Sequence, residues 1–181
     1  MTIEIEQHVL HFKFPAGTSR GVYHDRTIWL VKAIDSSDLH TKHGIRVGIG
    51  ECAPLPKLRC DDLPYYEEVL RYFCDKVQCT GKIDYDSMRN YPSMLFGIET
   101  ALLNLEHGPM LFDTPFSRGI EGIPINGLVW MGSFDEMSQR IEQKLAQGFR
   151  CVKLKIGAID FDSELCLLKR IRQRFGPREV E

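Results

Sequence analysis

The sequence has little that would mark a nucleic-acid-binding, membrane or disulfide-rich protein. Its 23 Lys and Arg residues are outnumbered by 25 Asp and Glu residues, and the formal net charge is −2. A chain of this charge has no electrostatic reason to bind nucleic acid or an anionic membrane surface. No apolar run approaches the length of a membrane span, and residues 1–10 lack the continuous apolar stretch of a signal peptide. We therefore expect a cytoplasmic protein with no nucleic-acid or membrane partner.

Paired cysteines and nucleotide-binding motifs are also absent. The glycines of residues 44–50 have neither the GxGxxG spacing nor the following helix of a dinucleotide loop, and they fit a twisted strand. His40 and His43 have an HxxH spacing in a polar turn, but no acidic or cysteine neighbour makes a metal site there. No CxxC pair occurs, so we expect reduced cysteines that serve mainly in packing: Cys52, Cys60, Cys74, Cys79, Cys151 and Cys166.

What the sequence does contain is a lysine-bearing strand, CVKLKIG, at residues 151–157. Because side chains alternate along a strand, Lys153 and Lys155 share one face and the apolar residues at 152, 154 and 156 share the other. Lysines on an exposed edge strand also protect against aggregation, and the run by itself leaves that alternative open. If the apolar face packs on helices, the lysines point into a barrel interior or a sheet crevice. A cation there is paired or has a lowered pKa, and both are properties of catalytic lysines.

Helix signals on both sides of this strand indicate a parallel sheet. Ser133 and Glu136 form a capping-box signature before a helical pattern that ends at Gly148. Asp160 or Asp162 can cap a second helix, with the apolar stripe Leu165, Leu168, Ile171 and Phe175. Residues 123–130 read as a strand before the first helix, and residues 178–181 read as the opening of a third strand. Alternation of strand and helix is typical of a parallel sheet covered by helices.

The amino-terminal half has a different organisation. Residues 3–14, 27–34 and 44–51 read as three strands of an antiparallel meander, with a longer glycine-bearing loop at residues 15–26. Two helices follow, one beginning near residue 62 and one near Pro92. The amino-terminal part is therefore α+β and the carboxy-terminal part α/β, with the boundary near residues 109–122.

Five segments together resemble the enolase superfamily, muconate-lactonising subgroup: FKFPAGTSRG (12–21), GECAPLP (50–56), SMLFGIETALLNL (93–105), NGL (126–128) and KLKIG (153–157). The resemblance covers essentially the whole chain. It implies an α+β capping domain, a three-stranded antiparallel meander plus helices, at residues 1–115. It also implies that residues 116–181 are the first part of a (β/α) TIM-like barrel, incomplete in this chain.

The resemblance also implies a chemistry and a set of site residues. Enzymes of this subgroup abstract a proton α to a carboxylate, and Mg²⁺ bound to that carboxylate stabilises the resulting enediolate. By position, Lys155 resembles the acid/base lysine, and the like charge of Lys153 would lower its pKa. Ser19 and Arg20, in a glycine-hinged lid, and Asn126, at the mouth of the first barrel strand, would contact a small-molecule carboxylate substrate.

The sequence departs from the superfamily in its extent. The acidic metal ligands and the second catalytic lysine belong to later barrel strands, which this sequence does not contain. Since roughly two and a half of eight strand–helix units cannot close a barrel, we expect part of a longer enzyme, inactive by itself, with Mg²⁺ held only in the whole parent. Asp160, Asp162 and Glu164 are expected to cap a helix and not to bind metal. Elimination, epimerisation and cycloisomerisation all remain open, as does a non-catalytic binding module.

Overall fold

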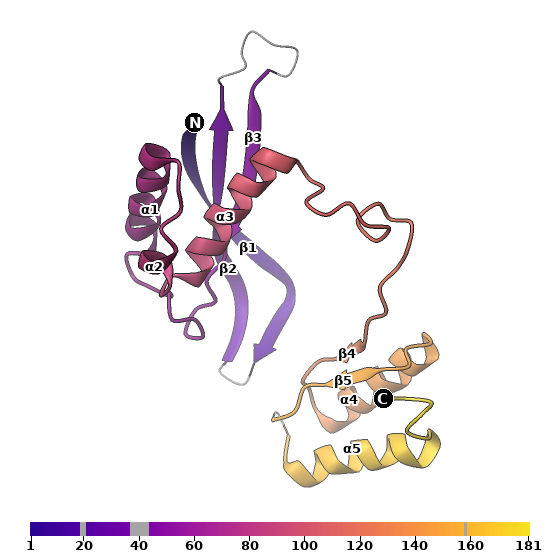
Figure 1. Ribbon diagram of the computed structural model, residues 1–181. Helices are drawn as coiled ribbons and strands as arrows, with labels where there is room; N and C mark the ends of the chain where they lie inside the picture. The colour runs from indigo at the N-terminus through magenta and orange to yellow at the C-terminus, as the bar shows by residue number, and fades with distance from the viewer. Residues whose placement is uncertain (19–20, 37–43, 158) are drawn as a thin grey trace. The chain divides into compact units, whose positions relative to one another are not determined.

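The computed structural model describes residues 1–18, 21–36, 44–157 and 159–181. These residues form two compact units, whose elements are labelled in Figure 1. Unit 1 comprises Met1–Phe14 and His24–Arg118, and unit 2 comprises Pro15–Tyr23 and Gly119–Glu181. No helix in the described part of the chain is long and apolar enough to cross a membrane.

Unit 1 is built on a three-stranded sheet with the order β1 (Thr2–Thr18), β2 (Gly21–Asp35), β3 (Arg46–Cys52). β2 and β3 are antiparallel, and Asp35 lies opposite Arg46, whose guanidinium donates to its carboxylate at 2.7 Å. Alternation along β2 buries Trp29, Val31 and Ala33 on one face. The predicted meander is confirmed.

The connection between the first two strands differs from our prediction. We expected a loop over residues 15–26, but β1 continues to Thr18 and β2 already begins at Gly21. The Thr18 hydroxyl donates to the Gly21 carbonyl at 2.9 Å. Glycines and a proline do not by themselves end a strand that has a neighbouring strand to pair with, so the sequence signal for a loop was misleading. The predicted lid residues Ser19 and Arg20, and the two histidines 40 and 43, lie outside the described residues.

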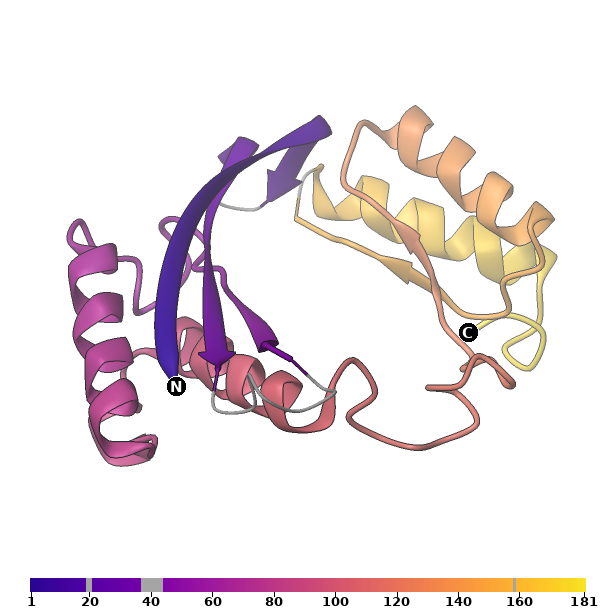
Figure 2. The ribbon, with the colours of Figure 1, turned by 90° about the horizontal axis from the view of Figure 1, so that it is seen from above.

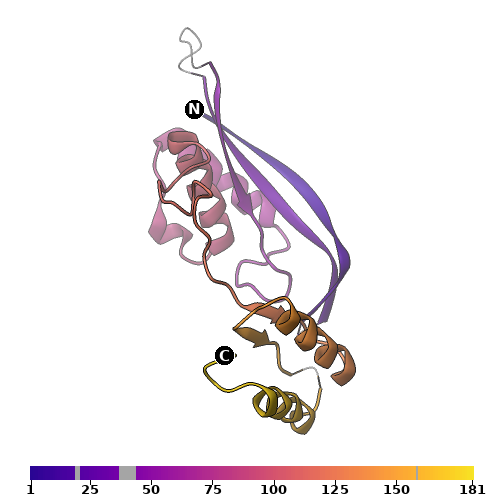
Figure 3. The same cartoon turned by 90° about the vertical axis from the view of Figure 1, so that its right-hand side faces the viewer.

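Three helices cover one face of this sheet, as Figure 3 shows: α1 (Tyr66–Thr80), α2 (Tyr85–Met88) and α3 (Pro92–His107). The predicted helices correspond to α1 and α3, whereas the short α2 was missed. The helices and the sheet enclose one apolar core, whose fully buried larger members include Val31, Leu70, Val77, Met88, Met94 and Ile98.

Glycines allow α3 to lie directly on β3. A Cβ built on Gly50 would lie 1.9 Å from the Gly97 carbonyl oxygen, and one on Gly48 would lie 2.1 Å from the Ala101 carbonyl oxygen. A Cβ on Gly97 would in turn lie 2.2 Å from the Cys52 sulfur. The twisted-strand interpretation of Gly48 and Gly50 therefore missed their main role, which is close helix–strand packing.

The amino terminus of α3 is held by a buried carboxylate. Asp61 is fully buried, and its Oδ2 accepts hydrogen bonds from the backbone nitrogen and the hydroxyl of Ser93, both at 2.6 Å. The Ser93 hydroxyl also lies 2.6 Å from the Tyr66 hydroxyl. These bonds satisfy one of the free N–H groups at the start of the helix and tie α3 to α1.

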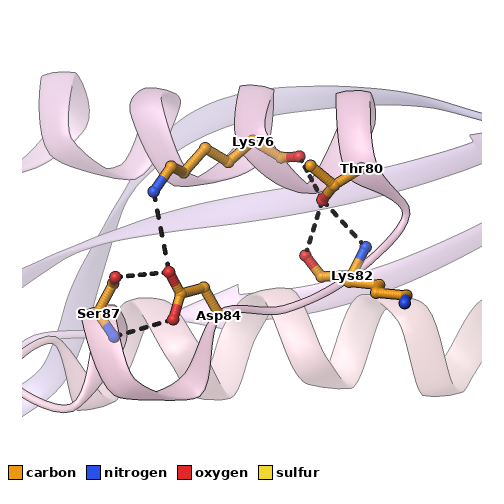
Figure 4. A network of polar contacts seen from close by, with 5 residues as sticks. All are labelled: Lys76, Thr80, Lys82, Asp84 and Ser87. Carbon is orange, nitrogen blue, oxygen red and sulfur yellow. Dashed lines mark hydrogen bonds and ion pairs between the residues drawn. The ribbon is translucent and has the colours of Figure 1, made fainter.

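The turn between α1 and α2 is closed by the polar network in Figure 4. The Thr80 hydroxyl bonds to the Lys76 carbonyl at 2.8 Å and to the backbone of Lys82. Asp84 caps α2, because it accepts from the backbone nitrogen of Ser87 at 3.1 Å and from its hydroxyl at 2.6 Å. These hydrogen bonds from Ser87 hold the pKa of Asp84 below its ordinary value, and the Lys76 ammonium, 3.9 Å away, adds to the effect.

Unit 2 has a parallel strand pair, β4 (Gly127–Val129) and β5 (Val152–Leu154). Helices α4 (Phe134–Ala146) and α5 (Phe161–Arg174) lie on one side of it (Figure 2). The capping box of Ser133 and Glu136 is present, and Asp160 caps α5 by accepting from the Ser163 nitrogen at 2.9 Å. The predicted strand–helix–strand–helix order is confirmed.

The residues after α5 begin a third strand beside β5. The Glu181 nitrogen donates to the Arg150 carbonyl, and the Val152 nitrogen donates to the Glu181 carbonyl, both at 2.8 Å. Two such bonds from one residue to both neighbours of its partner are the pattern of a parallel ladder, with Glu181 beside Cys151. The predicted opening of a third strand therefore has its hydrogen bonds in place.

Two details of unit 2 were predicted wrongly. β4 and β5 are shorter than the runs 123–130 and 151–157, and Ile156, expected on the packed face, is 62% exposed. On α5 the buried residues are Glu164 and Leu167, whereas Leu168 is 44% exposed. Leu167 therefore takes the inward place expected for Leu168, whereas Ile171 of the expected stripe does pack against the core cluster of this unit.

Candidate functional site

Lys155 lies one residue beyond the carboxyl end of β5, beside Trp130, which follows β4. The Lys155 nitrogen donates to the Val129 carbonyl at 3.2 Å, which continues the parallel ladder past the last paired residues. The two side chains therefore leave neighbouring strands on the same face. The Lys155 ammonium lies 3.6 Å from the centre of the Trp130 ring, a cation–π contact.

Lys153 lies on the same strand face but is more open. It is exposed, and its neighbour across the ladder is Leu128, while Lys155 is half-buried. Val152 and Leu154 pack instead against the cluster of Val129, Met137, Ile141 and Leu167. The alternation that we predicted is thus observed: the apolar residues face the helices and the two lysines face away from them. Burial of the pair, which we also expected, is not observed for Lys153.

A buried glutamate holds the chain that follows Lys155. Glu164 of α5 is 6% exposed, and its Oε1 accepts a hydrogen bond from the Gly157 nitrogen at 2.5 Å. Gly157 has a φ of 98°, a conformation that residues with a side chain rarely adopt. We expected Glu164 only as a helix-capping residue. The sequence signal that we overlooked is a carboxylate in the first turn of a helix that follows a strand ending in glycine.

The far end of the β1–β2 hairpin, Pro15–Tyr23, groups with unit 2. Within that unit, a Cβ built on Gly17 would lie 3.7 Å from Nε1 of Trp130. This nitrogen is buried and has no hydrogen-bond partner among the described residues. Gly17 therefore approaches the same indole ring that the Lys155 ammonium contacts. The substrate contacts predicted for Ser19 and Arg20 fall outside the described residues.

Asn126 lies at the other end of the strand pair. It is exposed and immediately precedes β4, so it lies at the amino-terminal end of a strand whose carboxyl end leads to Trp130. The next residue, Gly127, donates its backbone N–H to the Cys151 carbonyl at 2.8 Å, just before the start of β5. The structure does not bring Asn126 next to Lys155, and a role for it in substrate binding remains a prediction.

The described residues do not assemble a metal centre. No group of three or more His, Cys, Asp or Glu side chains among them could hold a metal ion. In the described part of the chain no carboxylate lies within ion-pair distance of Lys153 or Lys155. The site geometry therefore consists of a lysine on an indole ring, a second lysine two residues before it, and a glutamate that holds the following turn.

Comparison with known proteins finds similar sequences and structures along the whole of this chain. No family model matches the sequence. An o-succinylbenzoate synthase from Desulfotalea psychrophila is 34% identical, over all of this chain and 56% of the relative. The crystal structure of MenC from Desulfotalea psychrophila matches with a TM-score of 0.69 and 31% identity, over 100% of this chain and 55% of that one.

More distant solved structures share the fold. An o-succinylbenzoate synthase from Thermosynechococcus elongatus, complexed with Mg in the active site, has a TM-score of 0.65 at 22% identity, over 98% of this chain and 50% of its own. The L-Ala-D/L-Glu epimerase from Bacillus subtilis has a TM-score of 0.60 at 19% identity, over 99% and 51%. The chain spans about half the length of the relatives that it matches. Its fold is therefore that of a capping domain followed by the first part of the barrel.

Proposed function

We propose that this chain supplies the capping domain, residues 1–115, and the first barrel units, residues 116–181, of an o-succinylbenzoate synthase. The observation that carries the proposal is the 34% identity to such a synthase across the whole chain. The reaction is the elimination of water from 2-succinyl-6-hydroxy-2,4-cyclohexadiene-1-carboxylate, a step of menaquinone biosynthesis. The partner would be this small-molecule carboxylate, and the enzyme would act in the cytoplasm.

In this proposal Lys155 is the acid/base residue. Its neutral amine would take the proton α to the substrate carboxylate, and the electrons of that C–H bond would form the ring double bond. The C–O bond would break as the Lys155 ammonium returns the proton to the hydroxyl, which leaves as water. The position of Lys155 at a strand end, on the face opposite the helices, supports this role. The indole of Trp130 holds the Lys155 side chain at this strand end through a cation–π contact.

Mg²⁺ enters the proposal only as a cofactor of the whole enzyme. Mg²⁺ prefers carboxylate oxygens in octahedral geometry, and the described residues offer no such set near the lysines. The residues of this chain therefore do not fit a magnesium site by themselves. We propose that the ligands belong to parts of the parent enzyme that this sequence does not include.

The test is replacement of Lys155 by alanine in an enzyme that carries this chain together with the remaining barrel. Loss of a positioned acid/base group should reduce turnover by about 10²-fold or more. The matched control is Lys169→Ala, which removes an exposed lysine of α5 and should leave turnover unchanged. Turnover is followed by ultraviolet absorbance of o-succinylbenzoate, and folding by circular dichroism. Near-normal turnover of a folded Lys155→Ala enzyme would contradict the assignment.

The same preparation separates the alternatives within the subgroup. Epimerisation of dipeptides or cycloisomerisation of muconate, with no aromatisation of the cyclohexadiene, would replace the proposed substrate. Absence of every such activity in the whole folded enzyme would favour a non-catalytic module. Lys153→Ala, which removes the exposed lysine on the same strand face, should reduce turnover less than Lys155→Ala does.

A further inference from the structure

Trp130 follows β4, and core packing does not explain its large side chain. The buried cluster of unit 2 consists of Val129, Met137, Ile141 and Leu167, and the indole is not among the described side chains that pack against it. Val129 faces the helices, so alternation along the strand turns Trp130 to the other face. The residue is nevertheless half-buried. The contacts of the indole outside the core therefore have to account for it.

The contact that stands out is the one with Lys155. The Lys155 ammonium lies 3.6 Å from the centre of the Trp130 ring. In the described part of the chain no ion pair holds this ammonium. A lysine has a flexible stem, and its nitrogen reacts efficiently at one place only if the conformations of that stem are restricted. The face of the indole supplies this restriction.

Arg140 of α4 fixes the backbone that carries the indole. Its guanidinium Nη1 donates to the carbonyl oxygens of Trp130 and Met131, both at 3.0 Å. The carboxylate of Glu136 lies 3.6 Å from the same guanidinium. Because β4 ends at Val129, the two carbonyls lie beyond the strand ladder. Hydrogen bonds from a charged donor therefore take over where the ladder stops.

Gly132 leaves room for this guanidinium. A Cβ built on Gly132 would lie 2.8 Å from Nη1 of Arg140 and 2.9 Å from Oε2 of Glu136. A side chain at this position would displace the guanidinium from the two carbonyls. The segment between β4 and α4 thus combines an arginine that holds it with a glycine that admits the arginine.

We propose that Trp130 is a positioning residue for Lys155, and that Arg140 acts on Lys155 through Trp130. The indole holds the side-chain nitrogen at the carboxyl end of β5, and Arg140 holds the indole. The inference rests on the proposed function of Lys155 as the acid/base residue and adds two residues to it. All three residues belong to unit 2.

The first test compares Trp130→Phe with Trp130→Leu in an enzyme that carries this chain together with the remaining barrel. Leucine keeps an apolar side chain without a ring, whereas phenylalanine keeps a ring that binds a cation less strongly than indole does. We expect kcat to fall about tenfold for leucine and about threefold for phenylalanine, with KM changed less than about twofold. Equal kcat values for the two variants, or a change in KM alone, would overturn the positioning role.

Phe149→Leu is the matched control, because it removes another ring of unit 2 that a lysine contacts. The Lys144 ammonium lies 5.2 Å from the centre of that ring. Phe149 precedes β5, whereas Lys155 follows it. The control should keep kcat within about twofold of the unchanged enzyme. A tenfold fall in the control as well would overturn the assignment to Trp130 in particular.

A double variant tests whether Arg140 acts through the indole. Arg140→Met keeps the stem of the side chain and removes both hydrogen bonds to the carbonyls. We expect it to lower kcat about threefold by itself and to have no further effect in Trp130→Leu, since residues of one chain of contacts are not additive. Arg150→Gln removes an exposed arginine of the same unit and should leave kcat unchanged. Independent losses that multiply in the double variant would overturn the role of Arg140.

A spectroscopic measurement separates this inference from the proposed function. Reductive methylation with isotope-labelled formaldehyde adds methyl groups to lysine amines and keeps their charge. An aromatic ring 3.6 Å from the Lys155 nitrogen should shift its methyl signals upfield. Lys155→Arg identifies these signals by their loss. The shift should disappear in Trp130→Leu and persist in Phe149→Leu, without any substrate.

The two proposals then fail in different ways. Methyl signals of Lys155 at the position of exposed lysines would overturn the contact with Trp130, even in an enzyme that forms o-succinylbenzoate. Shifted signals that depend on Trp130, in a folded enzyme without synthase activity, would support the contact and refute the synthase assignment.

Discussion

Unit 1 and unit 2 are both built from capped helices that pack on paired strands, but they differ in how much apolar surface they bury. In unit 1 three helices and three strands bury one continuous core, from Trp29 on the sheet to Ala101 on α3. In unit 2 the buried cluster consists of Val129, Met137, Ile141 and Leu167. Correct capping and correct strand order therefore do not by themselves make an independently stable body, since tertiary burial supplies most of the stability.

The open side of unit 2 lies along β5. A hollow of about 360 Å³ there is lined mainly by apolar residues, among them Val152, Leu154, Leu168 and Val180. Among the described residues, Val180 and Glu181 begin to cover this edge of the strand pair. A two-stranded sheet with one layer of helices is below the size that is usually stable in isolation.

The strongest test of this comparison is to separate the units. We expect residues 1–118 to unfold in urea as one cooperative transition and residues 119–181 to show helix content without such a transition. Circular dichroism and the dispersion of amide proton signals distinguish the two behaviours. A cooperative transition of residues 119–181 alone would mean that its small core suffices.

Within unit 1 the largest effect of a single methyl group is expected at Gly50. Gly50→Ala should cost more than about 3 kcal/mol of unfolding free energy, because its Cβ would meet the backbone of α3 at 1.9 Å. Gly122→Ala is the matched control, since no atom lies within 4 Å of a Cβ built there, and it should change stability by less than about 0.5 kcal/mol. Similar urea midpoints for the two variants would show that α3 can move away from β3.

In unit 2 the expected effects are smaller and local. Ser133→Ala removes one half of the capping box of α4 and should cost about 1 kcal/mol. Glu136→Gln should preserve most of the box, because an amide can still reach back to the Ser133 nitrogen. Amide hydrogen exchange in the first turn of α4 measures both, and equal exchange rates in the two variants would argue against the box.

The smallest expected effect is a dependence on acid. Hydrogen bonds from Ser133 hold the pKa of Glu136 below its ordinary value of 4.5, and those from Ser163 hold the pKa of Asp160 below 3.8. A carboxylate with a lowered pKa in the folded state stabilises that state above its ordinary pKa and ceases to do so as the pH falls through the lowered value. Helix content of α4 and α5 should therefore decrease below about pH 4. A Glu136→Gln, Asp160→Asn double variant should flatten this dependence, and an unchanged acid profile would contradict it.

The geometry of the candidate site residues was likewise predicted only in part from the sequence. The alternation of the 151–157 run correctly put Lys153 and Lys155 on the face away from the helices. The contact of Lys155 with Trp130 was not predicted, because it depends on the register of two strands that lie 25 residues apart in the chain. Glu164 was assigned to helix capping. Its hydrogen bond from the Gly157 nitrogen was not predicted, because the bond forms only when the chain after β5 folds back onto α5.

The sequence by itself determined the order of the main helices and strands, the cap at Ser133, a second cap at Asp160 or Asp162, and the family resemblance, because each rests on residues that are close together in the chain or on short motifs. Only the tertiary structure decided the close packing of α3 on β3 through Gly48, Gly50 and Gly97, and the contact between Trp130 and Lys155. These depend on contacts between residues far apart in the sequence, and side-chain periodicity carries no information about which distant surfaces meet.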